Sequence, residues 1–190
     1  FYSRSPLPEQ LLMDTYQHCL AAQLDTPNGM LSVDESSFVK KGTHSIGVKR
    51  QYCGRLGKRG NCQVGVFLAY AGDRGYGLVD RDLYIPQDWF EPSHGSLRRE
   101  CHLPQGQAFA TKNQIALRML NQALGSGRFH VQWIGCDAAY GMTMPSWMAC
   151  CSRNRHGILR QPIPKNRFFW KCPRSAPLRQ VGDVPGNTHG

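Results

Sequence analysis

The strongest restriction on the fold comes from two apolar segments, far apart in the chain, that each lead to an aspartate. Residues 30–36 carry Asp34 near their end, and residues 129–136 are followed directly by Asp137. Short apolar runs bounded by turn residues are typical of strands. A lone aspartate at such a position is most often a helix cap or a turn residue. Two on separate strands of one sheet can instead bring their carboxylates together at one sheet edge.

Two helices and two further strands are predicted around these segments. Apolar residues recur at helical spacing in both helices, and Thr111 with Gln114 gives the second helix a capping-box start. In chain order these elements are a helix over 8–24, strands over 63–71 and 76–85, and a helix over 111–124 that ends at Gly125. Many α/β proteins alternate strands and helices in this way. The order favours an α/β, ribonuclease-H-like core with a mixed sheet flanked by helices, incomplete at its C-terminus.

A run of basic residues indicates the kind of partner. The chain has a formal net charge of +10 and an isoelectric point near 9.4, and residues 40–59 contain no acidic residue. Glycines interrupt this run, so we expect a flexible cationic loop or a hairpin. Basic side chains that neutralise phosphates release counterions, which favours a nucleic acid partner. The side chains expected to contact DNA phosphates are Lys40, Lys41, Lys49, Arg50, Lys58 and Arg59; for each of them a solvated surface charge is the alternative.

The sequence also bears on cellular location. It has no apolar run of bilayer-spanning length, and its N-terminus lacks the basic-then-apolar pattern of a signal peptide. The 8 cysteines are scattered without a Cys-x-x-Cys pair, which favours reduced thiols over zinc or disulfides. We therefore expect a soluble protein of the cytoplasm with no membrane partner, associated with the nucleoid if its partner is DNA.

The two aspartates match the needs of one reaction class. Phosphoryl transfer between nucleic acid strands is run efficiently by two magnesium or manganese ions, one beside the attacking oxygen and one beside the leaving oxygen. Such ions are held by a few carboxylates, water and substrate phosphate. Asp34, in Leu-Ser-Val-Asp-Glu-Ser, and Asp137, in Trp-Ile-Gly-Cys-Asp-Ala-Ala-Tyr-Gly, are the candidate ligands. Glu35 follows Asp34 directly and is expected on the opposite face of the strand, so it is secondary.

Four stretches of sequence resemble insertion-sequence transposases of the DDE type. They are residues 33–68, 83–89, 111–117 and 137–141, within a similarity that spans about Ser5 to Gly141. The resemblance implies a ribonuclease-H-like catalytic core in which Asp34 and Asp137 are the first two members of an acidic triad that binds Mg²⁺ or Mn²⁺. It also implies cleavage of transposon ends, strand transfer into target DNA, and assembly as a homo-oligomer on DNA. The basic loop then lies beside the cleavage site.

The resemblance stops at Gly141. A third carboxylate is expected on a later helix, yet the only acidic residue after Asp137 is Asp183, in a Gly- and Pro-rich tail. Back-translation of 142–160, read in a shifted frame, gives N-D-H-A-F-L-D-G-L-L-Q-Q-E-S-A-W-Y-F, an acidic amphipathic helix of the kind expected there. We therefore interpret residues 1–141 as a partial catalytic core and 142–190 as a degenerate or frameshifted segment with a disordered tail. An ordinary divergent loop is the alternative.

Two rival functions stay open on the sequence alone. A stand-alone ribonuclease-H-like nuclease would use the same carboxylates but would cut DNA without joining it. A non-catalytic DNA-binding module, or an inactive fragment of a transposase, would need only the basic loop, and both aspartates would then be structural. Strand joining separates the first rival from a transposase, and metal-dependent cutting separates the second.

Overall fold

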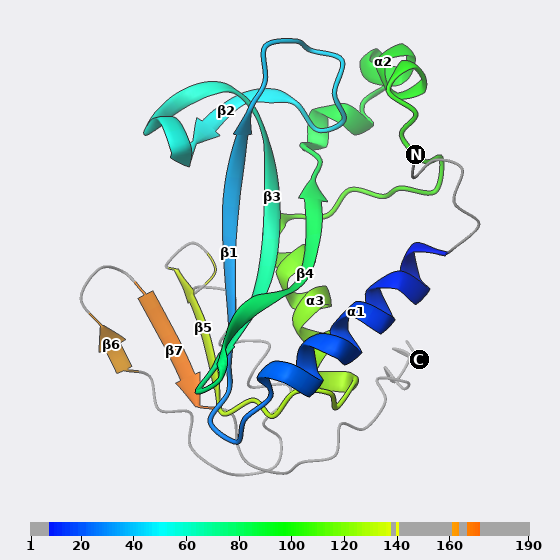
Figure 1. Ribbon diagram of the computed structural model, residues 1–190. Helices are drawn as coiled ribbons and strands as arrows, with labels where there is room; N and C mark the ends of the chain where they lie inside the picture. The colour runs from blue at the N-terminus through cyan, green and yellow to red at the C-terminus, as the bar shows by residue number, and fades with distance from the viewer. Residues whose placement is uncertain (1–7, 138–139, 141–160, 164–166, 172–190) are drawn as a thin grey trace, which may run out of the picture.

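The computed structural model describes residues 8–137, 140, 161–163 and 167–171 of the 190-residue chain. It contains a mixed sheet flanked by helices (Figure 1). The helices are α1 (Glu9–Leu24), α2 (Gly95–Glu100) and α3 (Lys112–Gly125). The strands are β1 (Met30–Val39), β2 (Lys49–Cys53), β3 (Lys58–Gly72), β4 (Gly75–Tyr84), β5 (Trp133–Asp137), β6 (Gln161–Ile163) and β7 (Arg167–Lys171). Short 3-10 helices cover Gly54–Leu56, Gln87–Phe90 and Pro92–His94.

The sheet has seven strands in the order β2-β3-β1-β5-β7-β6, and β4 also pairs with β3. β3 holds two partners along one edge, because its first part pairs with β2 and its second part with β4. β1 lies on the other edge of β3, antiparallel to it and parallel to β5. β7 pairs with β5 and runs antiparallel to it. Three antiparallel strands continued by a parallel strand, with helices packed on them, are compatible with the predicted ribonuclease-H-like fold.

The main hydrophobic core lies between the sheet and α3. The buried stripe of α3 includes Ile115, Met119 and Leu120, and it meets strand residues such as Leu31 and Val33, which are 0% and 1% exposed. Successive strand residues point to opposite faces. Because Leu31 and Val33 face the core, the alternate residues of β1 face away from it. This alternation decides where the acidic residues of β1 can point.

A hydrogen-bonded anchor fixes the start of β1. The Asp25 carboxylate accepts hydrogen bonds from the His130 backbone N–H at 2.7 Å and from the Tyr70 hydroxyl at 3.1 Å, and its other oxygen lies 2.6 Å from His130 Nδ1. Burial raises the pKa of the Asp25 carboxyl, but the hydrogen bonds from His130 and Tyr70 outweigh it, so the net pKa lies below the usual range. The anchor joins the end of α1, the end of β3 and the segment before β5.

We expect this anchor to make stability depend on acid pH. A carboxyl group whose pKa is depressed by folding stabilises the protein above the pKa of the unfolded chain and loses that contribution as pH falls through the lower, folded value. The wild type should therefore lose free energy of unfolding below about pH 4, and Asp25→Asn should be less stable near neutrality and vary less with acid pH. Urea unfolding at several pH values measures both. Parallel pH curves for the two proteins would contradict the role given to Asp25.

The predicted elements are present, with informative differences at their ends. The basic segment forms a hairpin, one of its two predicted alternatives, because β2 pairs in register with the start of β3. β1 and β3 extend beyond the predicted 30–36 and 63–71, since β1 pairs with β3 along its full length and the start of β3 also pairs with β2. β5 begins only at Trp133, four residues after the predicted start, and Phe129 joins the core from the preceding loop. The interpretation of residues 142–190 stays a prediction: residues 142–160 lie outside the described part of the chain, and the described residues of that range form β6 and β7.

The helix ends agree with the local sequence signals only in part. Thr111 and Gln114 form both bonds of the capping box, as predicted. The predicted stop Gly125 is the last helical residue, and the left-handed turn follows at Gly127, with φ 62°. α2 was not predicted, because a six-residue helix is too short for a periodic pattern. Its Leu97 packs with Trp89 and Ile85 in a small separate core.

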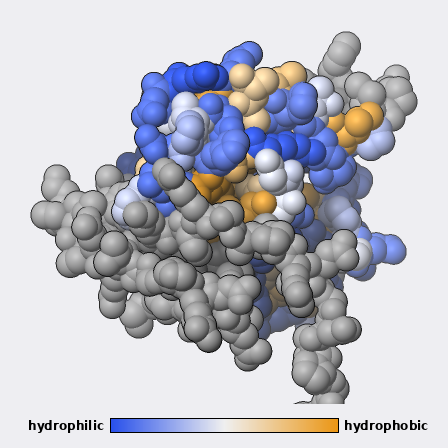
Figure 2. All heavy atoms as spheres, turned by 90° about the horizontal axis from the view of Figure 1, so that it is seen from below, coloured by the Kyte–Doolittle hydropathy of each residue, from blue (hydrophilic) through white to orange (hydrophobic). Residues whose placement is uncertain are grey.

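The described surface that is visible from below (Figure 2) is mainly polar. Figure 2 shows hydrophilic residues over most of the coloured atoms, with hydrophobic residues in small separate areas. None of the helices in the described part of the chain has the length and apolar character that a membrane crossing requires.

Candidate active site

The parallel pairing of β1 and β5 brings the two predicted aspartates to one place. In that register Val33 pairs with Cys136, so Asp34 and Asp137 are the next residues along the two strands. Val33 and Cys136 are buried on the core face, at 1% and 5% exposure, and strand alternation turns the following aspartates to the other face. Adjacent strands lie about 4.8 Å apart. The structure therefore places Asp34 and Asp137 side by side on the same face.

Both carboxylates are held by backbone hydrogen bonds. Asp34 Oδ1 accepts the Glu35 N–H at 2.8 Å, and Asp137 Oδ1 accepts the Tyr140 N–H at 3.4 Å. Asp34 is exposed and Asp137 is half-buried, so both remain accessible at the outer face of the sheet. An oriented, accessible carboxylate pair is the donor arrangement that a hard divalent cation requires.

Glu35 points to the opposite face from Asp34, as the sequence predicts. Its carboxylate accepts hydrogen bonds from Lys112 Nζ at 2.9 Å and from the Tyr140 hydroxyl at 3.2 Å. Burial raises the pKa of Tyr140, and the nearby charges of Glu35, Asp137 and Asp34 raise it further, so its hydroxyl stays protonated and donates. Lys112 opens α3, and Tyr140 follows β5. Sequence reasoning assigned no role to either residue, although both lie in stretches that resemble the family, because their contacts with Glu35 form only in the folded chain.

The donors that Asp34 and Asp137 present on this face of the sheet are oxygen atoms. Burial, together with the charge of Asp137, raises the pKa of the Cys136 thiol to about 12, so the sulfur is a neutral thiol rather than a thiolate. Two carboxylates with substrate phosphate and water form a fitting set for Mg²⁺ or Mn²⁺. Within the described residues, no group of three His, Cys, Asp or Glu side chains could hold a metal ion. The expected third carboxylate is therefore not among them, and Asp183 lies outside them.

The predicted DNA contacts lie beyond the aspartates, around the end of β1 and the β2–β3 hairpin. Lys41, Arg50, Lys58 and Arg59 are exposed, and Lys40 is half-buried. Lys49 differs from the others, because its ammonium group pairs with Asp88 in the 3-10 helix after β4. Hairpin pairing therefore gathers these side chains at one end of the molecule, with Lys49 already engaged.

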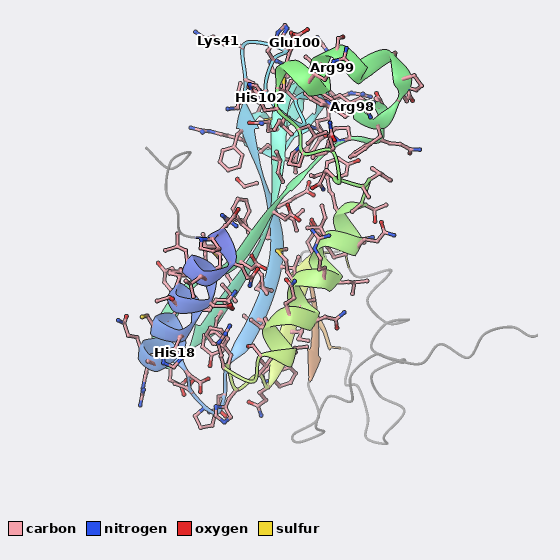
Figure 3. The ribbon with its side chains drawn as sticks, turned by 90° about the vertical axis from the view of Figure 1, so that its right-hand side faces the viewer. His18, Lys41, Arg98, Arg99, Glu100 and His102 are labelled. Atoms are coloured by element: carbon pink, nitrogen blue, oxygen red, sulfur yellow. The ribbon has the colours of Figure 1, made fainter. Side chains whose placement is uncertain are left out.

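α2 adds positive charge to the same end. Figure 3 shows Arg98, Arg99 and His102 near Lys41, whereas His18 lies on α1 at the other end. His44 Nε2 lies 3.2 Å from the Glu100 carboxylate, a contact that joins the β1–β2 loop to α2. No ion pair of Arg98 or Arg99 occurs within the part of the chain that the structure describes. The two arginines therefore extend the basic end, a feature that sequence spacing did not indicate.

A second concave region does not compete with this site. A polar cleft of about 480 Å³ lies between α1, β4 and α3. Its three arginines are each matched by a carboxylate, in the pairs Arg81–Glu9, Arg118–Asp82 and Arg128–Asp14. Asp80 is a fourth carboxylate in the lining, so carboxylates outnumber arginines by one and the cleft has no surplus positive charge for a phosphate.

Comparison with known proteins agrees with this geometry. A family model described as DDE superfamily endonuclease matches residues 1–181. The chain belongs to this family. The predicted resemblance to DDE-type transposases is thereby confirmed at the level of the family, and with it nuclease or transposase-type chemistry on a DNA substrate. No curated protein and no solved structure matches the chain. DDE superfamily endonucleases typically use divalent metal ions, in accord with the paired carboxylates of Asp34 and Asp137.

Proposed function

We propose that this DDE superfamily endonuclease cuts DNA at transposon ends and joins the freed ends to target DNA, with Asp34 and Asp137 as ligands of Mg²⁺ or Mn²⁺. The observation that carries the proposal is the β1–β5 register, which sets both carboxylates side by side on one accessible face. We further propose that the chain works as a homo-oligomer on DNA, in the cytoplasm at the nucleoid.

The proposed reaction has two successive phosphoryl transfers at one metal site. Asp34 and Asp137 hold the cations, whose chemistry when bound is to lower the cost of charge on the attacking and leaving oxygens. In the first reaction, water attacks a phosphodiester, the bond to the 3′ oxygen breaks, and a 3′ hydroxyl is released. In the second, that hydroxyl attacks a target phosphodiester, so one bond forms as one breaks. The protein forms no covalent bond to DNA in either reaction.

The basic end, formed by the end of β1, the β2–β3 hairpin and α2, has the right position to bind the DNA that is cut. Lys40 follows Asp34 by six residues along extended backbone, a span of roughly 20 Å. That span corresponds to about six base pairs of duplex at 3.4 Å each. A duplex with a phosphate at the aspartates can therefore also reach the basic end. Contacts of this kind position DNA without reading its sequence.

We predict that Arg98 and Arg99 contribute to DNA binding. Log affinity falls with log salt concentration, and each phosphate contact makes this slope steeper by about 0.9. Arg98→Ala/Arg99→Ala should therefore weaken duplex binding and reduce this slope by about 1 to 2. Fluorescence anisotropy of a labelled duplex over a salt series measures both. Arg74→Ala, in the exposed β3–β4 turn, is the matched control and should leave the slope unchanged. If the double variant has the same slope as the wild type, α2 does not contact the DNA.

A non-catalytic DNA-binding role is the second candidate function. It is favoured by one observation, the lack of a third acidic ligand beside Asp34 and Asp137 among the described residues. The deciding experiment incubates the full chain with supercoiled plasmid and Mg²⁺ or Mn²⁺, with a chelator in a parallel reaction. Metal-dependent nicking supports the catalytic proposal, and salt-sensitive binding without nicking supports the binding role. Joined products with donor DNA that carries the flanks of the encoding gene separate a transposase from a simple nuclease.

A further inference from the structure

Glu35 and Tyr140 connect the two aspartates through a continuous chain of hydrogen bonds. The Glu35 N–H donates to Asp34, at 2.8 Å, and the Tyr140 N–H donates to Asp137, at 3.4 Å. The side chains of these two donor residues are bonded to each other, because the Tyr140 hydroxyl donates to Glu35 Oε2 at 3.2 Å. The residues that fix the carboxylates are therefore fixed relative to one another.

Packing and charge hold this link in place. The Tyr140 side chain is buried in the main core and is 2% exposed. Lys112 Nζ lies 2.9 Å from Glu35 Oε1 and 2.8 Å from Oε2, so it bridges both oxygens of the carboxylate. The same ammonium group lies 5.3 Å from the centre of the Tyr84 ring. Three elements, β1, α3 and the segment after β5, thus meet behind the aspartates.

We infer that Tyr140 and Glu35 are positioning residues that hold Asp34 and Asp137 in the orientation needed to share divalent cations. This inference rests on the proposed function, since it assumes that the two aspartates bind metal. Glu35 itself faces the core side of β1 and is engaged by Lys112 and Tyr140, so it acts through its neighbours rather than as a ligand.

The physical reason is the cost of orienting two like charges. Two carboxylates on neighbouring strands repel each other and turn apart unless they are held. Groups that hydrogen-bond to metal ligands keep them oriented, and their loss typically lowers metal affinity by a factor of ten or more. The bond between Tyr140 and Glu35 links β1 to the segment after β5, so its loss should loosen both aspartates together.

The test is Mn²⁺ binding to the full chain, followed by the electron paramagnetic resonance signal of free Mn²⁺. Tyr140→Phe removes only the hydroxyl and keeps the buried ring, and we expect it to weaken Mn²⁺ binding about tenfold. Tyr16→Phe is the matched control, because it also removes a tyrosine hydroxyl bond, to the Leu78 carbonyl oxygen at 2.6 Å, on α1. The control should bind Mn²⁺ like the wild type.

A second pair of variants keeps the inference testable if Tyr140→Phe does not fold. Glu35→Gln retains an oxygen that can accept the Tyr140 hydroxyl bond, whereas Glu35→Ala retains none. We expect Glu35→Gln to bind Mn²⁺ within about twofold of the wild type and Glu35→Ala to lose about tenfold. Equal losses in the two would show that the charge of Glu35 matters rather than the bond, which would overturn the inference.

Failure of the inference and failure of the proposed function give different results. If the wild type binds Mn²⁺ no better than Asp34→Asn does, Asp34 is not a metal ligand and the proposed function fails. If the wild type binds and Asp34→Asn does not, but Tyr140→Phe binds as tightly as the wild type, the metal site stands and the positioning role is overturned. If both the metal site and the positioning role are correct, Mn²⁺ affinity falls in the order wild type, Tyr140→Phe, Asp34→Asn.

Discussion

Asp34→Asn should lose metal-dependent DNA cutting by about a thousandfold and still bind DNA. The amide keeps the size of the side chain but removes the charge and one of the oxygen donors that a cation needs. Metal ions contribute several kcal/mol to such reactions, and each 1.36 kcal/mol is a factor of ten in rate. The backbone bond from Glu35 can still reach the remaining oxygen, so the fold should be kept. Plasmid nicking measures the rate, and anisotropy of a labelled duplex without metal measures binding.

Asp137→Asn should have the same effect, because both carboxylates serve one site. Asp73→Asn is the matched control, since Asp73 is an exposed aspartate in the β3–β4 turn and lies on no strand beside β5. It should nick DNA like the wild type. Loss of DNA binding or of cooperative unfolding in Asp34→Asn would instead give that aspartate a structural role and would favour the binding module.

The sequence predicts elements whose signals are local. The helix over Lys112–Gly125 carries its own start code, and Asp73 to Gly75 mark the β3–β4 turn, so these elements appear where expected. Asp34 was predicted near the end of its strand, but β1 continues to Val39, so it is the parallel β1–β5 register that brings Asp34 beside Asp137. Periodicity and turn chemistry suffice where contacts between neighbouring residues decide the structure.

Interactions between distant segments set the features that sequence reasoning missed. The partners of Glu35 are Lys112 and Tyr140, and only the folded sheet brings these three residues together. The ion pair of Lys49 with Asp88 likewise joins two distant segments, and the sequence did not indicate it; the DNA contact of Lys49 stays a prediction. No spacing rule reports such contacts, because they depend on the strand register and on where a short helix docks.

Gly29 marks the point where the register of the site begins. Its carbonyl oxygen accepts hydrogen bonds from the Gln132 and Trp133 backbone N–H groups, at 2.7 and 3.2 Å, so it starts the pairing of β1 with β5. A Cβ at this position would lie 2.0 Å from the Tyr70 hydroxyl oxygen and 2.3 Å from the His130 carbonyl oxygen. Both atoms belong to the anchor around Asp25, and one of them is backbone.

Gly29→Ala should therefore lower the free energy of unfolding by about 3 kcal/mol, because overpacking at a site that cannot yield displaces backbone and breaks the bonds of Tyr70. Urea unfolding followed by tryptophan fluorescence measures the change, and an unchanged denaturant slope would assign it to the folded state. Gly125→Ala is the matched control, with nothing within 4 Å of the added carbon, and it should raise stability by about 0.5 kcal/mol. Equal stability of the two variants would show that the sheet can shift at Gly29, and the β1–β5 register would then not be fixed there. A destabilised but folded Gly29→Ala protein that also binds Mn²⁺ weakly would connect this register to the alignment of Asp34 with Asp137.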